Sequence, residues 1–377
     1  MVRLLHTADW QIGKCYGQFN PEEAALLAEA RFDVVSRIAA LATSQCADLV
    51  VVAGDVFDAQ GVSDRTVLRL FQLMSGFAGP WVMIPGNHDA GLAESVWTRA
   101  TRLRAIPENV HVCLRPEPLV LNDPSVVILP APLTQRHTYE DLTRWFDSVA
   151  TSEGVPRIGL AHGSVQGILA EDIDATNPIA ADRAGIAQLD YLALGDWHGT
   201  KQIDARTWYS GTPETDRFRN NESGQVLLVE IAAPGNAPAV TPMPTGRYRW
   251  RDIERELQVA SDVSSFVHEL EAFDTDDVVQ IKVRGHVDLE SHLAVSRAIG
   301  HTQARTRSLV VDLSELHLLP TDDDLRALRA DGYLGEVIAD LRAQEDGDNA
   351  EVARDALALL AGILDETRAP SANGDQR

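Results

Sequence analysis

The chain is 377 residues long, with 45% hydrophobic and 24% charged residues, a balance typical of globular proteins with room for about two domains. Its 56 acidic and 33 basic side chains give a formal net charge of −23, which argues against a protein that binds nucleic acid through its overall electrostatic field. There is no apolar run of the ~20 residues that a membrane span needs and no apolar leader in the opening MVRLLHTADW. The three cysteines lack metal-type spacing, so we expect reduced thiols in a cytoplasmic protein.

The first 245 residues alternate apolar runs typical of β-strands with helical patterns, which predicts an α/β layer structure. We expect strands over 2–7, 47–53, 81–85, 126–129, 158–161 and 191–194, and helices over 22–43 and 63–77. Several of these strands are continuous runs of Val, Leu and Ile, as in strands that are covered on both faces. The Pro- and Gly-rich stretch 233–246 interrupts the pattern, so we place the end of the first domain at residue 245.

A second, smaller α/β domain is predicted over 246–320, with strands over 278–283 and 308–313 and helices near 262–272 and 288–299. Two amphipathic helices follow over 321–369, and Thr321 and Asp324 are placed as a capping box at the start of the first. The apolar stripe of the second helix consists of Val352, Ala356, Leu359, Leu360 and Ile363. Residues 370–377 are polar, and we expect a disordered tail.

Five short polar motifs each follow a predicted strand of the first domain. They are DWQ at 9–11, GDVFD at 54–58, GNHD at 86–89, HG at 162–163 and GDWH at 195–198. Ligands of open α/β sheets bind beyond the carboxyl ends of the strands, so we expect the five motifs to meet in one crevice. They offer oxygen and imidazole donors and no thiolate, which favours hard or borderline divalent ions. The donors are too many for one ion and suit two ions that share a ligand, an arrangement used for displacement at a phosphodiester.

The set and order of these motifs resemble the calcineurin-like binuclear metallophosphoesterases. Within that superfamily, LLHTADWQIGK and DYLALGDWHGTKQI, followed by WYSGTPETDRF, are similar to the SbcD nuclease subunits, a family of double-strand-break repair nucleases. The resemblance covers residues 1–245, and the 250–320 segment resembles the family's capping domain by its order of elements. It implies a four-layer αββα sandwich with a smaller α/β capping domain and C-terminal helices.

The resemblance implies that seven side chains surround two divalent ions, with Mn²⁺ expected and Mg²⁺ or Fe²⁺ as alternatives. Asp9, Asp55 and His198 would hold the first ion, with Gln11 standing where the family usually has His. Asp55 would bridge to a second ion held by Asn87, His162 and Asp196. His88 would be a catalytic group that protonates the leaving oxygen or stabilises its charge, and Asp89 beside it would orient that imidazole.

Two of these positions depart from the family pattern. Gln11 exchanges a nitrogen ligand for an amide, and Asp196 replaces the first His of the usual GHxH, adding a carboxylate that favours Mn²⁺ or Mg²⁺. One interpretation is a decayed, inactive site. The other positions, His88 included, are intact, and decay would more often replace ligands by apolar residues. We therefore interpret the differences as a divergent but active branch.

The function expected from this resemblance is a metal-dependent DNA nuclease in repair or end processing. An SbcC-like coiled-coil ATPase would be its partner, docked through the C-terminal helices. This partner would supply the DNA-binding surface that an acidic chain lacks. The formation of a homodimer is left open. One alternative is a phosphodiesterase or phosphatase for a small nucleotide, for which a charge of −23 is no handicap. Another is a non-catalytic scaffold of the same fold.

Overall fold

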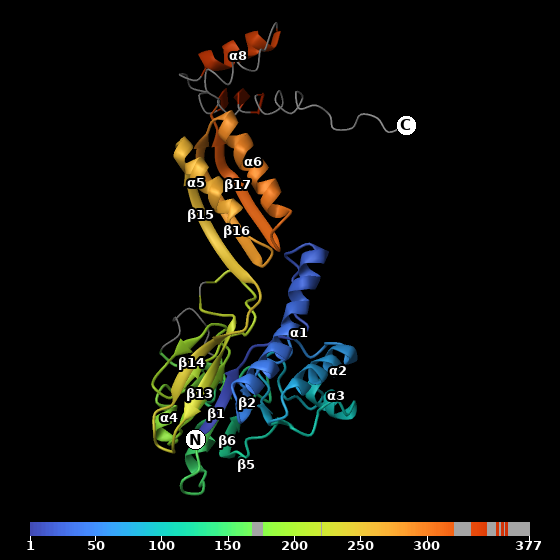
Figure 1. Ribbon diagram of the computed structural model, residues 1–377, viewed down its shortest axis with the longest axis vertical. Helices are drawn as coiled ribbons and strands as arrows, with labels where there is room; N and C mark the ends of the chain where they lie inside the picture. Colours follow the sequence, from blue (N-terminus) through green and yellow to red (C-terminus); the bar gives the residue numbers. More distant parts are fainter. Residues whose placement is uncertain are drawn as a thin grey trace. The chain divides into compact units, whose positions relative to one another are not determined.

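In the computed structural model the chain divides into two compact units, Met1–Arg249 and Trp250–Arg377 (Figure 1). The structure describes residues 1–167, 176–219, 221–319 and 333–344, together with residues 352, 353, 356, 357, 359 and 360. Within these ranges, no helix has both the length and the apolar character that crossing a bilayer would require.

The first unit contains two six-stranded mixed sheets. The first sheet has the order β14-β13-β1-β2-β3-β4, with bounds β1 Val2–Thr7, β2 Leu49–Val52, β3 Trp81–Met83, β4 Val110–Val112, β13 Gln225–Ile231 and β14 Ala239–Pro244. The second has the order β11-β12-β10-β7-β6-β5, with bounds β5 Leu119–Asn122, β6 Ser125–Ala131, β7 Arg157–His162, β10 Tyr191–Gly195, β11 Lys201–Gln202 and β12 Thr207–Tyr209. A small sheet pairs β8 Ser164–Val165 with β9 Pro178–Ile179.

Three apolar clusters hold the layers of this unit together. Side chains of one face of the first sheet, such as Val51 and Val82, pack against Ile128 and Leu160 of the second. The other face of the first sheet is covered by α1 Pro21–Ser44, α2 Asp64–Leu73 and α3 Val96–Arg102, which lie together in Figure 1. The outer face of the second sheet is covered by short segments that include η2 Arg144–Ser148 and α4 Arg183–Ile186. The result is an αββα sandwich, as predicted.

The helix that was predicted over 63–77 ends earlier. It consists of α2 and then the 3-10 turn η1 Met74–Gly76. The Pro- and Gly-rich stretch 233–246 was also interpreted too simply, because it contains the edge strand β14, in which Pro242 and Pro244 stand opposite Leu227 and Gln225 of β13. An edge strand tolerates proline because its outward side needs no N–H donor.

The second unit has the three-stranded sheet β15-β16-β17. Its bounds are β15 Arg249–Leu257, β16 Asp277–Val287, β17 Ser308–Leu318, α5 Ala260–Glu271, α6 Leu289–Gln303 and α8 Tyr333–Ala343. One apolar cluster joins α5 and α6 to the sheet through residues such as Phe266, Val295 and Ile281.

The C-terminal helical residues of this unit pack through a different stripe from the one expected. Leu357 is buried beside Ile338 and Leu289, and Leu360 packs against the same cluster, whereas Val352 and Leu359 are each 69% exposed. The expected capping box at Thr321 and Asp324, Ile363 of the expected stripe and the tail 370–377 lie outside the described residues.

Candidate metal centre

The polar motifs follow the carboxyl ends of β1, β2, β3, β7 and β10, so the strands bring them to one place in the first unit. Three of the carboxylates sit on backbone in the left-handed region, with φ of 54° at Asp9, 52° at Asp55 and 103° at Asp196. Gln11, with φ of 45°, does the same. Such a conformation costs a non-glycine residue about 1–3 kcal/mol and is concentrated at functional sites, where it aims a side chain.

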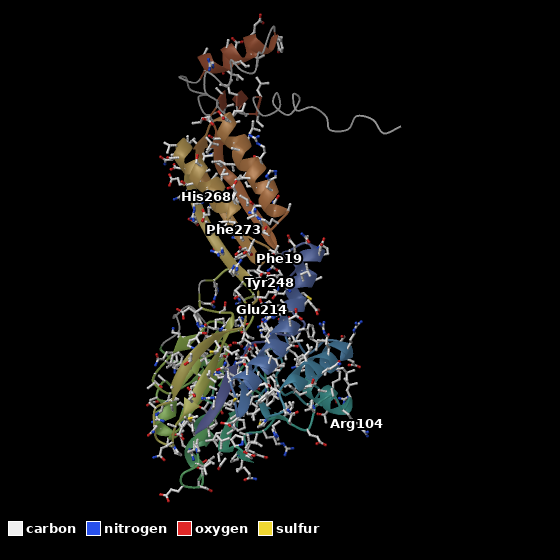
Figure 2. All side chains as sticks on the ribbon, in the orientation of Figure 1. Phe19, Arg104, Glu214, Tyr248, His268 and Phe273 are labelled. Atoms are coloured by element: carbon white, nitrogen blue, oxygen red, sulfur yellow. The ribbon has the colours of Figure 1, made fainter. Side chains whose placement is uncertain are left out.

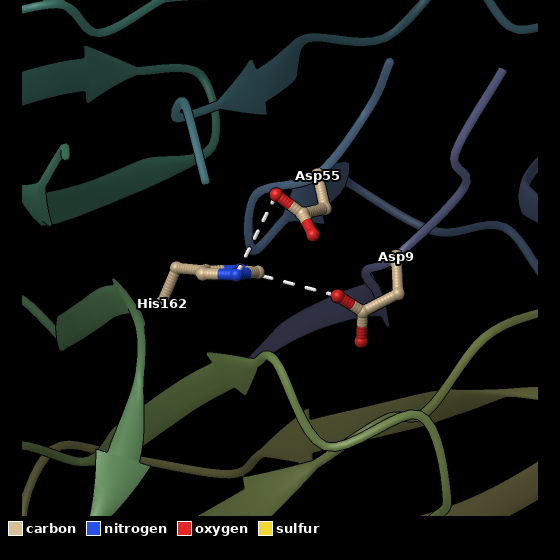
Figure 3. A group of neighbouring side chains, drawn as sticks. All are labelled: Asp9, Asp55 and His162. Atoms are coloured by element: carbon tan, nitrogen blue, oxygen red, sulfur yellow. Dashed lines mark ion pairs between the residues drawn. The ribbon is translucent and has the colours of Figure 1, made fainter. Parts of the chain in front are cut away.

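Asp9, Asp55 and His162 form the middle of the site, with one potential ligand atom from each lying within 4.8 Å of the others (Figure 3). His162 Nε2 lies 3.6 Å from Asp55 Oδ1, and His162 Nδ1 lies 4.0 Å from Asp9 Oδ1. All three side chains are at most 2% exposed. Two buried carboxylates this close to each other require a compensating cation.

The proton of His162 is held by the backbone. Its Nδ1 lies 2.8 Å from the carbonyl oxygen of Ala53 and donates to it, so that in the neutral ring the Nε2 lone pair faces the carboxylates. The Asn87 side-chain oxygen lies 2.9 Å from Nε2; with the amide turned, its NH2 instead donates to Nε2 and to both oxygens of Asp55, at 3.2 and 3.1 Å. An amide oxygen and an imidazole nitrogen at that separation are spaced as two ligands of one divalent ion.

Asp196 and His198 approach from the end of β10. Asp196 Oδ1 lies 3.7 Å from His162 Nε2, and the Asp196 backbone N–H donates to Asp9. His198 lies on the other side, where its Nε2 is 3.2 Å from the Gln11 amide nitrogen. The donors present, three carboxylates, two imidazoles and an amide oxygen, therefore suit hard or borderline divalent ions.

His88 stands beside this group and is 31% exposed. Its Nδ1 donates to the backbone carbonyl of Asp58 at 2.7 Å, its backbone N–H donates to Asp55 Oδ1 at 2.9 Å, and its Nε2 lies 3.9 Å from Asp55 Oδ2. The ring is thus oriented by a backbone carbonyl, with Nε2 directed toward the centre. This nitrogen is placed to hold or release a proton beside a bound phosphate.

Asp89 does not orient His88 as we expected. Its carboxylate accepts hydrogen bonds from the backbone N–H groups of Gly86, Val56 and Phe57, at 2.7, 2.9 and 3.1 Å, and it is fully buried. The carboxylate satisfies three otherwise unpaired donors and so joins the loop after β3 to the loop after β2. Asp89 therefore has a supporting role in this structure.

Burial and like charge raise the pKa values of the acidic groups here. Burial raises the pKa of Asp9 to about 6, against the lowering effect of His198 and His162. Burial, with the charge of Asp55, raises the pKa of Asp89 to about 7. Burial by itself would lower the pKa of His162, but Asp55, Asp196 and Asp9 raise it to about 9. Without a metal cation, the centre takes up protons to offset its negative charge.

This proton uptake makes stability depend on pH in the metal-free protein. A group whose pKa is higher in the folded than in the unfolded state stabilises the fold at low pH, and this contribution is lost as the pH rises to the folded-state pKa. That pKa is about 6 for Asp9, about 7 for Asp89 and about 9 for His162. His6, whose pKa burial lowers to about 3, acts in the opposite direction, but only below its ordinary value of 6.5. From pH 7 to 9 the term from His162 remains, so we expect the free energy of unfolding to fall by ~1–3 kcal/mol.

The measurement is urea unfolding at pH 7 and 9 in EDTA and again in excess Mn²⁺. Because ions replace protons at these groups, the decline should be smaller with Mn²⁺ than with EDTA. Equal pH dependence in the two conditions would contradict the electrostatic account of the centre.

Several residues around the centre were missed by sequence reasoning. Arg31 of α1 is 1% exposed and donates to the backbone carbonyls of Asp9, Trp10 and Glu214, which holds the loop after β1. The buried Glu214 carboxylate in turn accepts the backbone N–H of Tyr248, and both are labelled in Figure 2. Lys14 and Asp216 form an ion pair of 2.5 Å next to Gln11. Lys14, Glu214 and Asp216 lie within motifs quoted for the family, which was their one signal in the sequence, and Arg31 lies in none of them.

Four other side chains in or near the motifs have structural roles. Trp10 is buried and its indole N–H donates to the Thr7 hydroxyl, and the buried His6 ring is hydrogen-bonded to the Tyr191 hydroxyl and the Leu194 carbonyl. Arg99 donates to two backbone carbonyls and Arg102 pairs with Glu94.

Comparison with known proteins matches this geometry. The model of the calcineurin-like phosphoesterase family matches residues 2–229. Over 276 residues the chain is 26% identical to a protein of Bacillus subtilis (strain 168) named as the SbcD component of the nuclease SbcCD, covering 62% of this chain and 67% of that protein. A crystal structure of the Thermus thermophilus protein TT1561 aligns with 65% of this chain and 99% of its own, at 12% identity and a TM-score of 0.43, too remote a likeness to bear on the fold.

The family match spans all five motifs and, apart from β14 and the end of β13, the strands of both six-stranded sheets. The donors at the strand ends suit the divalent ions with which this fold hydrolyses phosphoesters. The chain belongs to the calcineurin-like phosphoesterase family.

Proposed function

We propose that the protein is a metal-dependent DNA nuclease that hydrolyses phosphodiester bonds in DNA repair or end processing. The observation that carries the proposal is the convergence of Asp9, Asp55 and His162 within 4.8 Å, with the partly exposed imidazole of His88 directed at them. Similarity to the SbcD component of the nuclease SbcCD supports DNA as the substrate.

The ligands in this proposal are Asp9, Asp55, Asn87, His162, Asp196 and His198. Gln11 lies beside His198, at the position where the family usually has a histidine ligand. We propose two divalent ions, with Mn²⁺ preferred because three of these groups are carboxylates. When bound, the ions supply the positive charge that stabilises a phosphodiester under attack and promotes ionisation of the attacking water.

His88 then acts on the leaving oxygen. Its Nδ1–H is held by the Asp58 carbonyl, so Nε2 is the nitrogen that can carry a proton toward the site. Donating that proton would neutralise the charge that develops on the leaving oxygen as its bond to phosphorus breaks.

For the remaining parts of the chain we propose the roles that the resemblance implies. Residues 246–320 would form a capping domain, and the C-terminal helices would dock on an SbcC-like coiled-coil ATPase. The relative in Bacillus subtilis is named as one component of a nuclease. The apolar side chains of Val352 and Leu359, each 69% exposed, fit a helical partner surface.

A second candidate, a phosphodiesterase for a small nucleotide, is favoured by a pocket beside the centre. The pocket has a volume of about 450 Å³, and its lining includes His88, Asn87, Leu92 and Arg136. This volume is usual for a small-molecule site, and the guanidinium of Arg136 can donate hydrogen bonds to a phosphate. The net charge of −23 also disfavours long DNA as the substrate of the isolated chain.

Cleavage assays separate the two candidates. Labelled single- and double-stranded DNA and a small chromogenic phosphodiester are offered with Mn²⁺, with and without an equimolar coiled-coil ATPase partner. We expect cleavage of DNA by the chain, increased by the partner. Turnover of the small diester with DNA untouched in every condition would move the assignment to the second candidate.

A further inference from the structure

The ion position beside Gln11 is framed by a chain of polar contacts that begins at a lysine. Lys14 Nζ lies 3.0 Å from Gln11 Oε1, and Gln11 Nε2 lies 3.2 Å from His198 Nε2. On the far side of the ring, His198 Nδ1 is 3.4 Å from Asp216 Oδ2, the oxygen that also accepts from Lys14 at 2.5 Å. The four side chains therefore close a ring of contacts.

The hydrogen-bonding roles of two of these side chains, Lys14 and Asp216, are fixed by their charge. An ammonium can only donate a hydrogen bond, and an ionised carboxylate can only accept one. Asp216 lies 2.5 Å from the Lys14 ammonium and 3.0 and 3.9 Å from the guanidinium groups of Arg217 and Arg31, so its carboxylate is ionised. Lys14 must then donate to Gln11 through the amide oxygen, which turns the NH2 group toward His198.

One tautomer of the His198 ring fits this orientation of the Gln11 amide. Asp216 Oδ2 can accept a hydrogen bond from His198 Nδ1–H, which leaves Nε2 as an acceptor for the Gln11 NH2. Arg217 Nη2 lies 2.8 Å from the same Nδ1 and 3.3 Å from Asp216 Oδ2. A guanidinium can only donate, so it competes with the Nδ1–H group for this carboxylate, and the orientation of Gln11 rests on Lys14. The reverse orientation of Gln11 would place its NH2 against the Lys14 ammonium, two donors facing each other.

We infer that Lys14 makes the two ion positions of the centre unequal, by locking the Gln11 amide with a hydrogen-bond donor toward the ion. An amide NH2 cannot ligate a cation, and here it also covers the His198 nitrogen that could. The position beside Asp55, Asn87, His162 and Asp196 has no such lock and fills first. The position beside Gln11 fills only at higher metal concentration.

The position of Lys14 beside Gln11 is fixed because its partner Asp216 is held by contacts from several sides. Its side chain is 1% exposed and contacts Lys14 at 2.5 Å, Arg217 at 3.0 Å and the buried Arg31 at 3.9 Å. Removing the Lys14 ammonium leaves two guanidinium groups beside this carboxylate. A Lys14→Met variant should therefore fold and free the amide to rotate its oxygen toward the ion.

The test is a Mn²⁺ titration of the full chain, read as bound ions per chain from the free-Mn²⁺ electron paramagnetic resonance signal, with no substrate present. In the parent we expect one ion bound at least ~10-fold more tightly than a second, the size of effect that groups around metal ligands commonly have. Lys14→Met should tighten the weaker ion by about that factor and leave the tighter one unchanged. Lys282→Met, which removes the same charge from a surface pair with Glu315 in the second unit, is the matched control and should change neither.

Two further variants separate the amide lock from simple charge repulsion. In a Gln11→Ala background, Lys14→Met should no longer tighten the weaker ion, because there is no amide to release. Gln11→Glu leaves Lys14 in place but has no NH2 group, so it should tighten the weaker ion on the order of 10-fold.

Equal affinity for both ions in the parent would overturn the inference, as would an undiminished effect of Lys14→Met in the Gln11→Ala background. The inference rests on the proposed metal-dependent hydrolysis only in requiring ions at this centre. Because the titration contains no substrate, it can fail while hydrolysis stands, and loss of DNA cleavage would leave the ion affinities measurable.

Discussion

Replacing Asp55 by asparagine is expected to abolish hydrolysis and ion binding together. Asp55 is 1% exposed and is the one carboxylate that lies near His162, Asn87 and the backbone N–H of His88 at once. Loss of its charge should weaken metal binding by more than the ~10–100-fold seen for groups that merely support a ligand. Asparagine is the suitable replacement because, like aspartate, it tolerates the positive φ of 52° at this position.

The measurement pairs bound Mn²⁺ per chain with the rate of phosphodiester cleavage. Asp58→Ala is the matched control, since it removes a carboxylate three residues along the same loop while keeping the backbone carbonyl that holds His88. It should preserve most of both readouts. An Asp55→Asn variant that bound ions as the parent does would show that the centre of the metal site lies elsewhere.

Replacing His88 by alanine should lower the rate of hydrolysis by ~10²–10⁴-fold while leaving ion binding intact, since a general acid contributes about that much. The separation is expected because the ring of His88 is held outside the group of donors, with Nε2 still 3.9 Å from Asp55 and Nδ1 committed to a backbone carbonyl. Loss of ions to the same degree as in Asp55→Asn would make His88 a ligand.

A leaving-group comparison tests the role of His88 more directly. A nitrophenolate leaves without needing a proton, whereas the alkoxide of a nucleoside does not. The His88→Ala defect should therefore be much smaller on a nitrophenyl diester than on DNA. Equal losses on both substrates would assign His88 to binding the phosphate, and His137→Ala, an exposed histidine outside the motifs, should be neutral on both.

The strands and the location of the site were predictable from the sequence. The first strand has the predicted bounds, 2–7, and the strands before the other four motifs fall within a few residues of their predicted ranges. Continuous apolar runs reveal buried parallel strands because both faces must be covered, and the ends of parallel strands share one edge. Local pattern and this geometric rule together located Asp9, Asp55 and His162 at one centre.

The contacts that set the chemistry within the site were not predictable in the same way. Two of the three N–H partners of Asp89, those of Val56 and Phe57, are 33 and 32 residues away in the chain, and the Lys14–Asp216 pair joins residues 202 positions apart. No local periodicity encodes such a contact, because it depends on how two loops at the ends of different strands approach each other in space. The side chain of Asp89 was therefore assigned to the neighbouring His88, although its hydrogen bonds go to buried backbone donors that had no other partner.

Thus the sequence by itself determined the α/β layer structure of the first domain, the metal-ligand types and the strand ends that carry them, since these follow from apolar periodicity and donor chemistry. The αββα arrangement of the layers was an implication of the family resemblance. The tertiary structure decided which way the Gln11 amide turns, which group orients His88 and what Asp89 supports. Each of these outcomes depends on which donors and acceptors meet across distant segments, and a buried polar group takes whichever partner the packing brings within hydrogen-bond distance.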